Sequence, residues 1–520
     1  MIAASTTAVP TEFVMTQINY AAVLPMFIVF GGGLVGVLIE AFAPRRVRHV
    51  AQVTLTLVTL VAALLAIAFS ARHHLGVTAA GAVVIDAPAL IFQGVVVALS
   101  AVGVLAMAER FTAGQADAFT QSGAAVPGSA REAVAVRLGA TSTEVFPLTL
   151  FAVVGMMLFP ASGDLLVMFV ALEVLSLPLY ILSGLARRRR LLSQEASLKY
   201  FLLGAFSSAF FLFGAALIYG YSGSLHLSDI AAAVQSQSGM DGLLIPGVLL
   251  VVIGLLFKVG AAPFHAWTPD VYQGAPSPVT GFMAAGTKVA AFGALLRVLY
   301  VAFEGVRWNW MPILWAVAIL TMVVGAVLSV TQTDMKRLLA YSSIAHAGFI
   351  LVGVLALNQK GISSTLFYLV AYGFTTIAAF AVVALVRSSG NEATHLSQWA
   401  GLGKRSPVTA GVFAFLLLAF TGIPLTSGFT AKFAVFSAAI AGGGTWLVIV
   451  GIICSGITAF VYIRVIVLMY FSEPAEGTMV MTPTAMSTLC VTLGVLVTLW
   501  LGIVPSPLLD LASQSTLFLR

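Results

Sequence analysis

The segment LFKVGAAPFH, residues 256–265, places a lysine, a glycine and a proline inside an apolar run. The run extends over residues 243–272, which is longer than the roughly 20 residues that one straight helix needs to cross a bilayer. Backbone that leaves the helical state at membrane depth is tolerated only where protein or a water-filled cavity satisfies its hydrogen bonds. The segment therefore predicts a membrane-spanning helix that is interrupted beside a buried cation.

The composition of the whole chain agrees with that prediction. Of its 520 residues, 60% are hydrophobic and only 8% are charged, whereas about 25% of the residues of an ordinary soluble domain are charged. The mean hydropathy is +1.05. A water-soluble fold cannot bury so much apolar surface and keep a wettable exterior, so we expect an all-α polytopic membrane protein.

Apolar runs of similar length recur along the chain. The span criterion predicts about 14 transmembrane helices, near residues 18–42, 50–71, 87–108, 144–160, 163–186, 195–222, 243–272, 278–303, 310–330, 336–357, 361–387, 408–440, 446–471 and 484–505. The seventh and twelfth runs are too long for one straight helix. These spans divide the chain into an N-terminal three-helix segment with an inward loop (1–143), two five-helix units (144–303 and 304–471) and a C-terminal helix segment (472–520).

The basic residues of the predicted loops give an orientation. If the N-terminus faces outside, the inward loops carry Arg45, Arg46, Arg48, Arg110, Arg131, Arg137, Arg187, Arg188, Arg189, Arg190, Lys336, Arg337, Arg387, Lys404 and Arg405. The outward segments carry only Arg72, Arg307, Lys360 and Arg520. This asymmetry follows the positive-inside rule, so both termini are expected outside. The run 187–190 could suggest nucleic acid or anionic lipid, but beside a predicted span it is interpreted as a topology anchor, and no nucleic-acid partner is expected.

Six basic residues fall inside predicted spans, namely Lys199, Lys258, Lys288, Arg297, Lys432 and Arg464. A charge at the bilayer centre costs at least about 2.5–3.5 kcal/mol and is a functional hypothesis by default. The two arginines cannot become neutral at ordinary pH. They are expected either to hold the structure together or to set the electrostatic field around the other buried groups. Lys199 has Glu195 one helical turn before it and can be satisfied locally or snorkel. The other three lysines lie deep in apolar sequence, where burial can bring proton exchange into a working range.

Glu173 is the acid that stands out in the predicted spans. The fourteen residues from Glu173 to Arg187 correspond to about 21 Å of helix, which places the carboxylate near the membrane middle. Pro178 frees the carbonyl of Val174 from its usual helical bond. A lysine on a neighbouring helix is the simplest partner for such a carboxylate. The alternative is a static ion pair between helices, although three deep lysines for one deep glutamate leave positive sites unpaired.

A second interruption, TGIPLTSGFTAK at residues 421–432, places Gly422 and Pro424 close to Lys432. Paired interrupted segments in the two halves of a transporter point to the ion site and suggest an inverted repeat. A plain proline kink accounts for either interruption by itself. It accounts less well for two interruptions that each lie beside a lysine. His265 and His346 lie near these elements and are candidate relays, because imidazole exchanges protons near neutral pH. A structural role is the alternative for each histidine.

The chain shows no motif for redox or hydrolytic chemistry. Cys454 and Cys490 are far apart and offer neither a disulfide framework nor metal-ligand spacing, and an iron–sulfur cluster needs several cysteine ligands. Residues 31–36 fit GxGxxG literally, but they lie inside the first span with no preceding strand. Small residues for close helix packing are the better interpretation. We expect no cofactor and no metal in this chain.

The run from Lys258 to Phe282, KVGAAPFHAWTPDVYQGAPSPVTGF, resembles the signature of the antiporter-like subunits of respiratory complex I, the proton-translocating NADH:quinone oxidoreductase. It is most similar to the subunit N branch, which includes mitochondrial subunit 2. Supporting matches are residues 173–180, 195–200, 334–343 and 423–433. The resemblance covers residues 144–471 strongly and the flanks weakly. The inward loop 109–143 is long for the family, and its role is not predicted.

This resemblance implies a fold of 14 helices with inverted repeats over spans four to eight and nine to thirteen, and helices seven and twelve discontinuous. It implies proton translocation in which Glu173 pairs with Lys258, Lys288 connects the two halves, and Lys432 is the terminal lysine. Lys199, His265 and His346 are candidate relays. FMN, iron–sulfur clusters and quinone would reside in partner subunits, and the chain would assemble with the other membrane subunits of complex I in a bacterial inner membrane.

Two other functions stay open at this point. A subunit of a multisubunit Na⁺/H⁺ antiporter would share this fold and the buried lysines, and sodium-dependent exchange without NADH would favour it. A passive scaffold subunit would keep pumping after the loss of all three lysines. A transporter of sugars or amino acids is a more distant alternative, because fold alone does not fix function.

Overall fold

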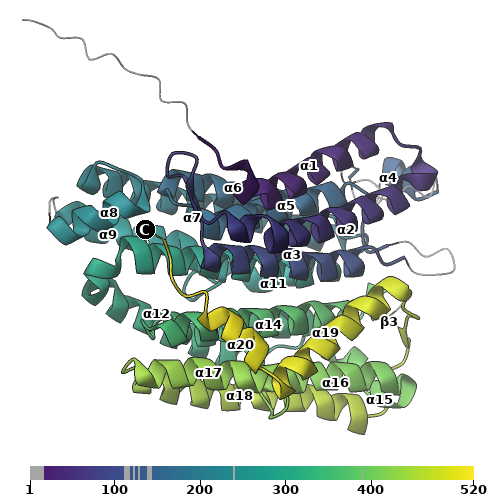
Figure 1. Cartoon of the computed structure of the whole chain (residues 1–520). Coiled ribbons are helices and arrows are strands. Elements are labelled where there is room, and N and C mark those ends of the chain that lie inside the picture. Colours follow the sequence, from purple (N-terminus) through teal and green to yellow (C-terminus); the bar gives the residue numbers. More distant parts are fainter. Residues whose placement is uncertain are drawn as a thin grey trace, which may run out of the picture.

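The computed structural model describes residues 17–110, 117–120, 123, 125–126, 129–137, 143–237, 241–388 and 391–519. In Figure 1 the long helices run side by side, from α1 and α2 at the top to α17 and α18 at the bottom. The predicted orientation of the two termini concerns residues 1–16 and Arg520, which lie outside the described residues.

The predicted N-terminal segment and first five-helix unit, residues 1–303, contain the helices α1 to α11 and the short helices η1 to η3. Their bounds are α1 (Tyr20–Phe42), α2 (Arg45–Phe69), η1 (Ala71–His73), α3 (Ala87–Met107), α4 (Ala130–Arg137), α5 (Val145–Leu158), η2 (Phe159–Ala161), α6 (Leu165–Ser183), α7 (Arg190–Ser222), α8 (Leu227–Ser236), α9 (Asp241–Val259), α10 (Trp267–Gly274), α11 (Ser277–Arg297) and η3 (Val298–Ala302).

The remaining helices belong to the second unit and the C-terminal segment. They are η4 (Glu304–Val306), α12 (Arg307–Val330), α13 (Met335–Val354), α14 (Gln359–Leu385), η5 (Leu396–Trp399), α15 (Leu402–Arg405), α16 (Pro407–Thr421), α17 (Ser427–Ala441), α18 (Thr445–Phe471), α19 (Ala485–Ile503) and α20 (Ser506–Ser513).

The strands are short and lie at the ends of helices. An antiparallel hairpin joins β1 (Gly76–Thr78) to β2 (Val83–Ile85). A three-stranded sheet has the order β4-β3-β5, with β3 (Val386–Ser388) between β4 (Asn391–Glu392) and β5 (Thr478–Val480). The fold is therefore a helical bundle with small β connections, which agrees with the predicted all-α membrane protein.

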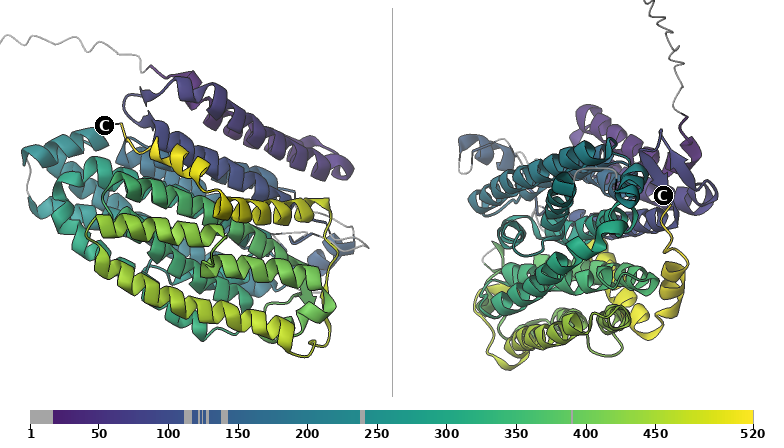
Figure 2. Two further views of the ribbon diagram at one scale, coloured as in Figure 1. Left: turned by 60° about the horizontal axis from the view of Figure 1, so that its bottom comes forward. Right: turned by 90° about the vertical axis from the view of Figure 1, so that its left-hand side faces the viewer.

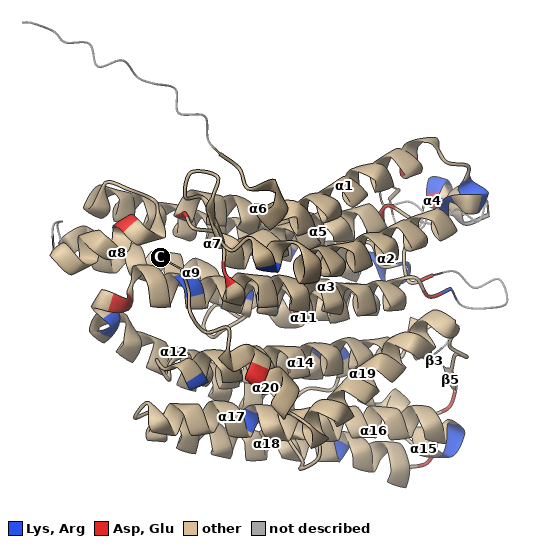
Figure 3. Ribbon diagram, viewed as in Figure 1, with Lys and Arg blue, Asp and Glu red and all other residues tan. Residues whose placement is uncertain are grey.

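Each predicted span coincides with a helix or with two consecutive helices. Among the described residues, 12 helices are long and apolar enough to cross a membrane. The predicted fourth span corresponds to the shorter apolar helix α5 with η2, and the predicted twelfth corresponds to α16 and α17. The bundle interior is apolar, and Figure 3 shows few charged residues along the helices.

Three helices form the centre of the bundle. In the apolar 18-residue stretch of each helix, 100% of the residues are buried in the α11 span, 94% in α14 and 89% in α13, against 39% in α1 or α18. The right-hand view of Figure 2 shows the helices nearly end-on, with α1–α3 on one side and α16–α18 on the other. Side chains of α11 and α14 are therefore the most enclosed by other helices, followed by those of α13.

Both predicted helix interruptions are present. Helix α9 ends at Val259, Gly260 takes a left-handed φ of +78°, and the chain resumes a helix at Trp267. Helix α16 ends at Thr421, Gly422 has φ +85°, and α17 starts at Ser427. Glycine is suited to both turns because the left-handed region is strained for residues with a Cβ atom.

The two five-helix units share matched contacts. Gly155 on α5 packs against the backbone of Leu175 on α6, and Gly325 on α12 packs against Ala345 on α13 in the same way. In both pairs, the second-unit residue lies 170 positions after its first-unit counterpart. These contacts are what a structural repeat would produce.

The start of the second helix in each unit repeats the same motif. Asp164 caps α6 and forms a β-bridge with His226, and Asp334 caps α13 and forms a β-bridge with His395. Asp334 also lies 170 positions after Asp164. The correspondence extends the match between the units from helix packing to helix capping.

Two predicted helix starts are wrong by five residues. The second span was expected to begin at residue 50 and the sixth at residue 195, but α2 begins at Arg45 and α7 at Arg190. For α7 the reason is tertiary: the side chain of Arg190 is 6% exposed, contacts Glu132 at 3.3 Å and donates to the carbonyls of Gly123 and Ala125. Arg190 is thus a buried link to the predicted inward loop, and Lys199 lies nine residues after the first residue of its helix.

Candidate functional site

Four helices carry the predicted ionisable residues. Glu173 lies in the middle of α6, Lys258 in the last turn of α9, Lys288 in α11 and Lys432 in α17. The lysines are 2%, 2% and 6% exposed, respectively. The structure therefore confirms that all three are buried, and each lies on or beside an interrupted helix.

Lys258 lies between aromatic rings rather than against an acid. Its ammonium is 5.3 Å from the ring centre of Tyr180 and 5.1 Å from that of Tyr200. Among the described residues it has no hydrogen-bond partner. Aromatic faces attract a cation electrostatically, so the two rings compensate part of the lost hydration while leaving the amine free to exchange a proton.

The aromatic surroundings of Lys258 depend on the helix interruption. Tyr200 stacks on Trp267, the first residue of α10, with ring centres 4.6 Å apart and planes at 9°. The indole of Trp267 donates to the carbonyl of Phe257 at 2.9 Å. The restart of the helix therefore positions the ring that faces the lysine.

Glu173 interacts with Lys258 through space. Its carboxylate accepts a hydrogen bond from the hydroxyl of Ser208 on α7, and it contributes to the electrostatic field at Lys258. Among the described residues, no ion pair within 4 Å joins the two side chains. The structure thus places Glu173 near Lys258 but not in direct contact with it.

Lys288 is bound to the backbone of the first interruption. Its Nζ donates to the carbonyl of Val259 at 2.7 Å. That carbonyl belongs to the last residue of α9, where it has no helical N–H ahead of it. The partial negative charge at a helix C-terminus attracts a cation, so the break in α9 itself stabilises Lys288.

Lys432 uses the second interruption in a related way. Its Nζ donates to the carbonyls of Phe420 and Thr421, at 3.0 and 2.8 Å, and to the hydroxyl of Ser455 on α18 at 2.8 Å. Both carbonyls lie at the end of α16. No carboxylate forms an ion pair with Lys432 among the described residues.

His346 occupies the centre of α13 and lies within electrostatic range of both Lys288 and Lys432. Its Nδ1 is 2.8 Å from the hydroxyl of Tyr368, and its Nε2 is 3.5 Å from that of Tyr462. The hydroxyl of Tyr462 is hydrogen-bonded to Ser342. Imidazole and hydroxyl groups in contact can pass protons, so the contacts of His346 allow the relay role, which stays a prediction.

The other two candidate relays lie at the edge of this arrangement. His265 lies within the first interruption and is half-buried, and its Nδ1 has no hydrogen-bond partner among the described residues. Lys199 is 44% exposed and is paired with Glu195 at 2.7 Å and Asp270 at 2.8 Å. Lys199 is therefore satisfied locally, as its spacing from Glu195 predicted.

The two arginines within the spans, buried Arg297 and half-buried Arg464, hold helix ends, in agreement with a structural role. Arg297 pairs with Asp86 at 2.6 Å and donates to the carbonyl of Pro160 at 2.5 Å. Arg464 donates to the carbonyls of Val330 and Gln332 at 2.8 and 3.2 Å.

Several contributors were not predicted from the sequence. They are the acid Asp86, the rings of Tyr180 and Tyr200, the hydroxyls of Ser208 and Ser455, and the tyrosines around His346. The position of Asp86 directly before Ala-Pro, a helix-start pattern, indicated a cap but not a buried ion pair. Among the described residues, no group of three His, Cys, Asp or Glu side chains could hold a metal ion.

Comparison with known proteins identifies the family. Residues 162–458, more than half of the chain, match the family model described as NADH:quinone oxidoreductase/Mrp antiporter, TM. NADH-quinone oxidoreductase subunit N of Salinispora arenicola is 57% identical over 518 residues, covering 98% of this chain and 100% of the relative. The subunit N of a Parafrankia species is 59% identical over 501 residues, covering 96% of this chain and 95% of the relative.

Solved structures agree in fold. A chain of respiratory complex I from Thermus thermophilus with bound aureothin superposes with a TM-score of 0.76 at 31% identity, covering 94% of this chain and 99% of that one. A chain of the Mrp complex from a Dietzia species gives a TM-score of 0.77 at 21% identity, covering 96% of this chain and 97% of that one, which is a likeness of fold alone. The chain belongs to the family of NADH-quinone oxidoreductase subunit N.

Proposed function

We propose that this chain translocates protons as a membrane-arm subunit of NADH:quinone oxidoreductase, with Glu173, Lys258, Lys288 and Lys432 as the proton carriers. The observation that carries the proposal is the state of the three buried lysines. Lys258 contacts two aromatic rings, and the other two contact carbonyl and hydroxyl oxygens. None has a carboxylate in hydrogen-bond contact among the described residues, so none is fixed as charged by a direct ion pair.

The first step takes place between Glu173 and Lys258. Because the carboxylate acts on the amine without touching it, a small change in their separation changes the balance between the charged and neutral forms of Lys258. Aromatic rings tolerate both forms, since they attract the ammonium and pack against the neutral amine. Redox events in partner subunits would drive this change.

The second step moves the proton laterally. Lys288 donates to the carbonyl of Val259, the residue that follows Lys258, so Lys258 and the amine of Lys288 both lie at the end of α9, where the interruption begins. His346 then interacts with both Lys288 and Lys432, with Tyr368 and Tyr462 in contact with its ring. The route therefore crosses the central helices α11 and α13, from the first unit to the second.

The last step releases the proton from Lys432. This lysine is held by backbone carbonyls and by Ser455 rather than by an acid, so a neutral Lys432 leaves no unpaired carboxylate behind. By this proposal FMN, iron–sulfur clusters and quinone belong to partner subunits, and this chain carries no redox site. The chain would assemble with the other membrane subunits of complex I in a bacterial inner membrane, with both termini outside.

Cation/proton antiport in an Mrp-type complex is the second candidate. It is supported by the similar fold of an Mrp chain at 21% identity. The relatives that match over nearly the whole chain are subunits of NADH-quinone oxidoreductase, which favours the first proposal. NADH-independent sodium/proton exchange in vesicles containing only this type of chain would favour the second.

The test is a Lys258→Met variant in the intact complex. Removing the exchangeable amine is expected to lower proton translocation at least about tenfold, in line with the contribution of a positioned acid–base group. The assembly should persist because Lys258 has no hydrogen bond to lose among the described residues. Proton uptake per NADH oxidised, measured in inverted vesicles, is the readout.

The matched control is Lys360→Met, which removes the same charge from an exposed position at the start of α14. It should pump normally. Wild-type proton stoichiometry in the Lys258→Met complex would contradict the proposed route. Normal pumping after loss of Lys258, Lys288 and Lys432 together would support a scaffold role instead.

A further inference from the structure

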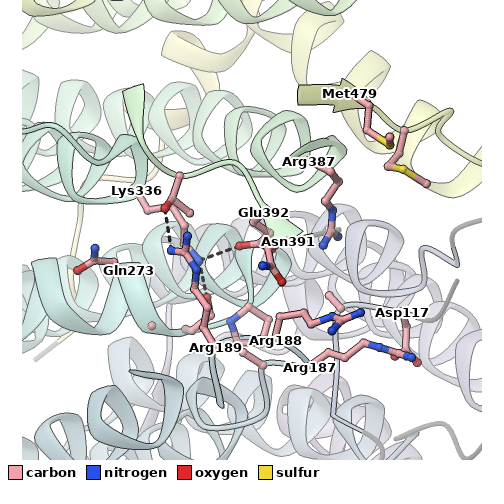
Figure 4. Close-up of a pocket in the computed structure, with 17 residues that line it drawn as sticks. Asp117, Arg187, Arg188, Arg189, Gln273, Lys336, Arg387, Asn391, Glu392 and Met479 are labelled. Atoms are coloured by element: carbon pink, nitrogen blue, oxygen red, sulfur yellow. Dashed lines mark hydrogen bonds and ion pairs between the residues drawn. The ribbon is translucent and has the colours of Figure 1, made fainter. Parts of the chain in front are cut away.

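A pocket of about 260 Å³ opens where the two five-helix units meet at the end of the bundle (Figure 4). Its walls come from the connection between α6 and α7, the turn between α10 and α11, the start of α13 and the hairpin of β3 and β4. These segments are predicted inward loops. The pocket is separate from the three lysines of the proton route, none of which lines it.

The lining of this pocket is strongly basic. Five cationic side chains line it, namely Arg187, Arg188, Arg189, Lys336 and Arg387, against the two acids Asp117 and Glu392. Figure 4 shows these side chains around one space, although they come from segments far apart in the sequence. The formal excess of three positive charges favours an anion.

Both carboxylate oxygens of Glu392 already accept hydrogen bonds from other groups of the protein. Its oxygens accept from the backbone N–H and the hydroxyl of Ser277, at 3.4 and 2.8 Å, and from Lys336 at 3.3 Å. Although burial opposes it, Lys336 and Arg387 lower the pKa of Glu392 below its usual value. The carboxylate pairs with Lys336 and also attracts Arg387, but among the described residues it forms no ion pair with Arg187 or Arg188.

Asp117 is a weak counterion for the arginines. Burial raises its pKa to about 6, although the N–H of Phe119, Arg187 and Arg110 act in the opposite direction. No ion pair within 4 Å joins Asp117 to Arg187 among the described residues. Asp117 therefore becomes neutral in mild acid and then offers the arginines no charge.

Three guanidinium groups crowd one side of the pocket. Burial lowers the pKa of Arg187, Asp117 opposes this, and Arg188 and Arg387 lower it further. Burial also lowers the pKa of Arg387, Glu392 opposes this, and Arg188 lowers it further. The Nη1 of Arg187 is buried without a hydrogen-bond partner among the described residues. Mutual repulsion and an unused buried donor indicate that an acceptor with several oxygens belongs here.

We propose that this pocket binds a phosphate-type oxyanion, supplied either by a phospholipid headgroup or by free phosphate. Guanidinium groups match tetrahedral oxyanions because they donate paired, charge-assisted hydrogen bonds. A basic pocket between transmembrane helices at the predicted cytoplasmic end is a typical headgroup site. The bound anion contacts residues of both units, Arg187 and Arg188 from the first and Arg387 from the second, and so joins them.

The test measures equilibrium binding to the intact complex after removal of native lipid. The probes are radiolabelled inorganic phosphate and dihexanoylphosphatidylglycerol. An Arg187→Gln/Arg188→Gln double variant should raise the Kd of the favoured probe at least about tenfold, since it removes two charge-assisted donors. The matched control is Arg45→Gln/Arg46→Gln, which removes two adjacent exposed arginines at the start of α2.

The comparison of probes identifies the source. Tighter binding of the lipid probe than of phosphate by tenfold or more assigns the site to a headgroup, and similar or tighter binding of phosphate assigns it to the free anion. Saturable binding that the Arg187/Arg188 variant does not change, or that the control pair weakens equally, overturns the proposal. Absence of saturable binding of both probes to the wild-type complex overturns it as well.

A second variant, Asp117→Asn, controls for misfolding. The proposal predicts that it binds an anion more tightly than the wild type, which a misfolded protein would not do. Asp117→Asn removes one of the two carboxylates that line the pocket, so sulfate, whose charge is constant over this range, should bind more tightly at pH 7.5. In the wild type, sulfate affinity should rise as pH falls through about 6, where Asp117 becomes protonated. The variant should lose that pH dependence. Unchanged sulfate affinity in Asp117→Asn contradicts the assigned site.

Discussion

The two predicted five-helix units share their scaffold contacts but hold two of their cations differently. In the first unit Arg297 pairs directly with Asp86, the capping residue of α3, and Lys258 lies in the field of Glu173. In the second unit Arg464 and Lys432 donate to carbonyl and hydroxyl oxygens. The contrast does not extend to every cation, because Lys288 of the first unit donates to a carbonyl and Lys336 of the second pairs with Glu392. Within the part of the chain that the structure describes, Arg464 and Lys432 are therefore solvated by dipoles rather than balanced by a counterion.

This difference separates two ways of keeping a charge in a low-dielectric interior. A counterion fixes the charge strongly and leaves an unpaired ion if its partner is lost. Carbonyl groups at the end of a broken helix stabilise an ammonium but leave no net charge when it deprotonates. By the proposed route, Lys258 would receive a proton under the control of Glu173, and Lys432 would release one.

The largest expected effect concerns the arginines. Arg297→Gln leaves Asp86 as an unpaired buried carboxylate and should destabilise the protein by about 3–5 kcal/mol. Arg464→Gln removes hydrogen bonds to carbonyls without leaving an ion behind and should cost about 1–3 kcal/mol. Thermal inactivation of the purified complex compares the two. A double Arg297→Gln/Asp86→Asn variant should recover part of the loss, and equal losses in the single variants would remove the distinction between the units.

A smaller effect is expected when the two lysines are compared for stability. Lys432→Met leaves two carbonyls and a hydroxyl without their donor and should cost about 1–3 kcal/mol. Lys258→Met removes no hydrogen bond among the described residues, so its loss should be smaller. Lys432→Arg serves as the control, because arginine can keep donating but cannot release a proton. Lys432→Arg should be as stable as the wild type but should not pump protons. If it still pumped, Lys432 would be excluded as a carrier.

The smallest effect concerns the glycines at the interruptions. Gly260→Ala and Gly422→Ala each force a Cβ into a left-handed conformation at a cost of about 1 kcal/mol. The added methyl group at Gly422 would lie 3.2 Å from Cδ of Lys432, whereas at Gly260 it would lie 3.7 Å from Nζ of Lys288. We expect the Gly422 variant to reduce pumping more. Gly456→Ala on α18, where a methyl group meets nothing within 4 Å, is the control.

Local sequence signals were sufficient to predict the spans, the helix interruptions and the burial of the three lysines. An apolar run, a glycine and a proline act on their own segment, so Gly260 and Gly422 could be located without knowing the fold. The same reasoning correctly separated Lys199, which has an acid one turn away, from the deeper lysines.

Partners distant in sequence were beyond those signals. Asp86 meets Arg297 across 211 positions, and Tyr180 and Tyr200 reach Lys258 only because α6, α7 and α9 pack together. The early start of α7 follows from contacts of Arg190 with Gly123 and Ala125, which lie 67 and 65 positions away. Such contacts depend on tertiary packing, which periodicity and residue type do not encode locally.

The contacts between the units at their predicted inward end also have a mechanical consequence. Arg189 donates to Thr394, Gln273 donates to Asp334, and Lys336 donates to the carbonyl of Ala275, each across the boundary between the units. Behind them α11 packs along α14. A rocking motion of one unit against the other, as in alternating-access carriers, would break these clamps together. We therefore expect a stiff frame in which side-chain and water rearrangements, rather than tilting of whole helix bundles, open and close the path.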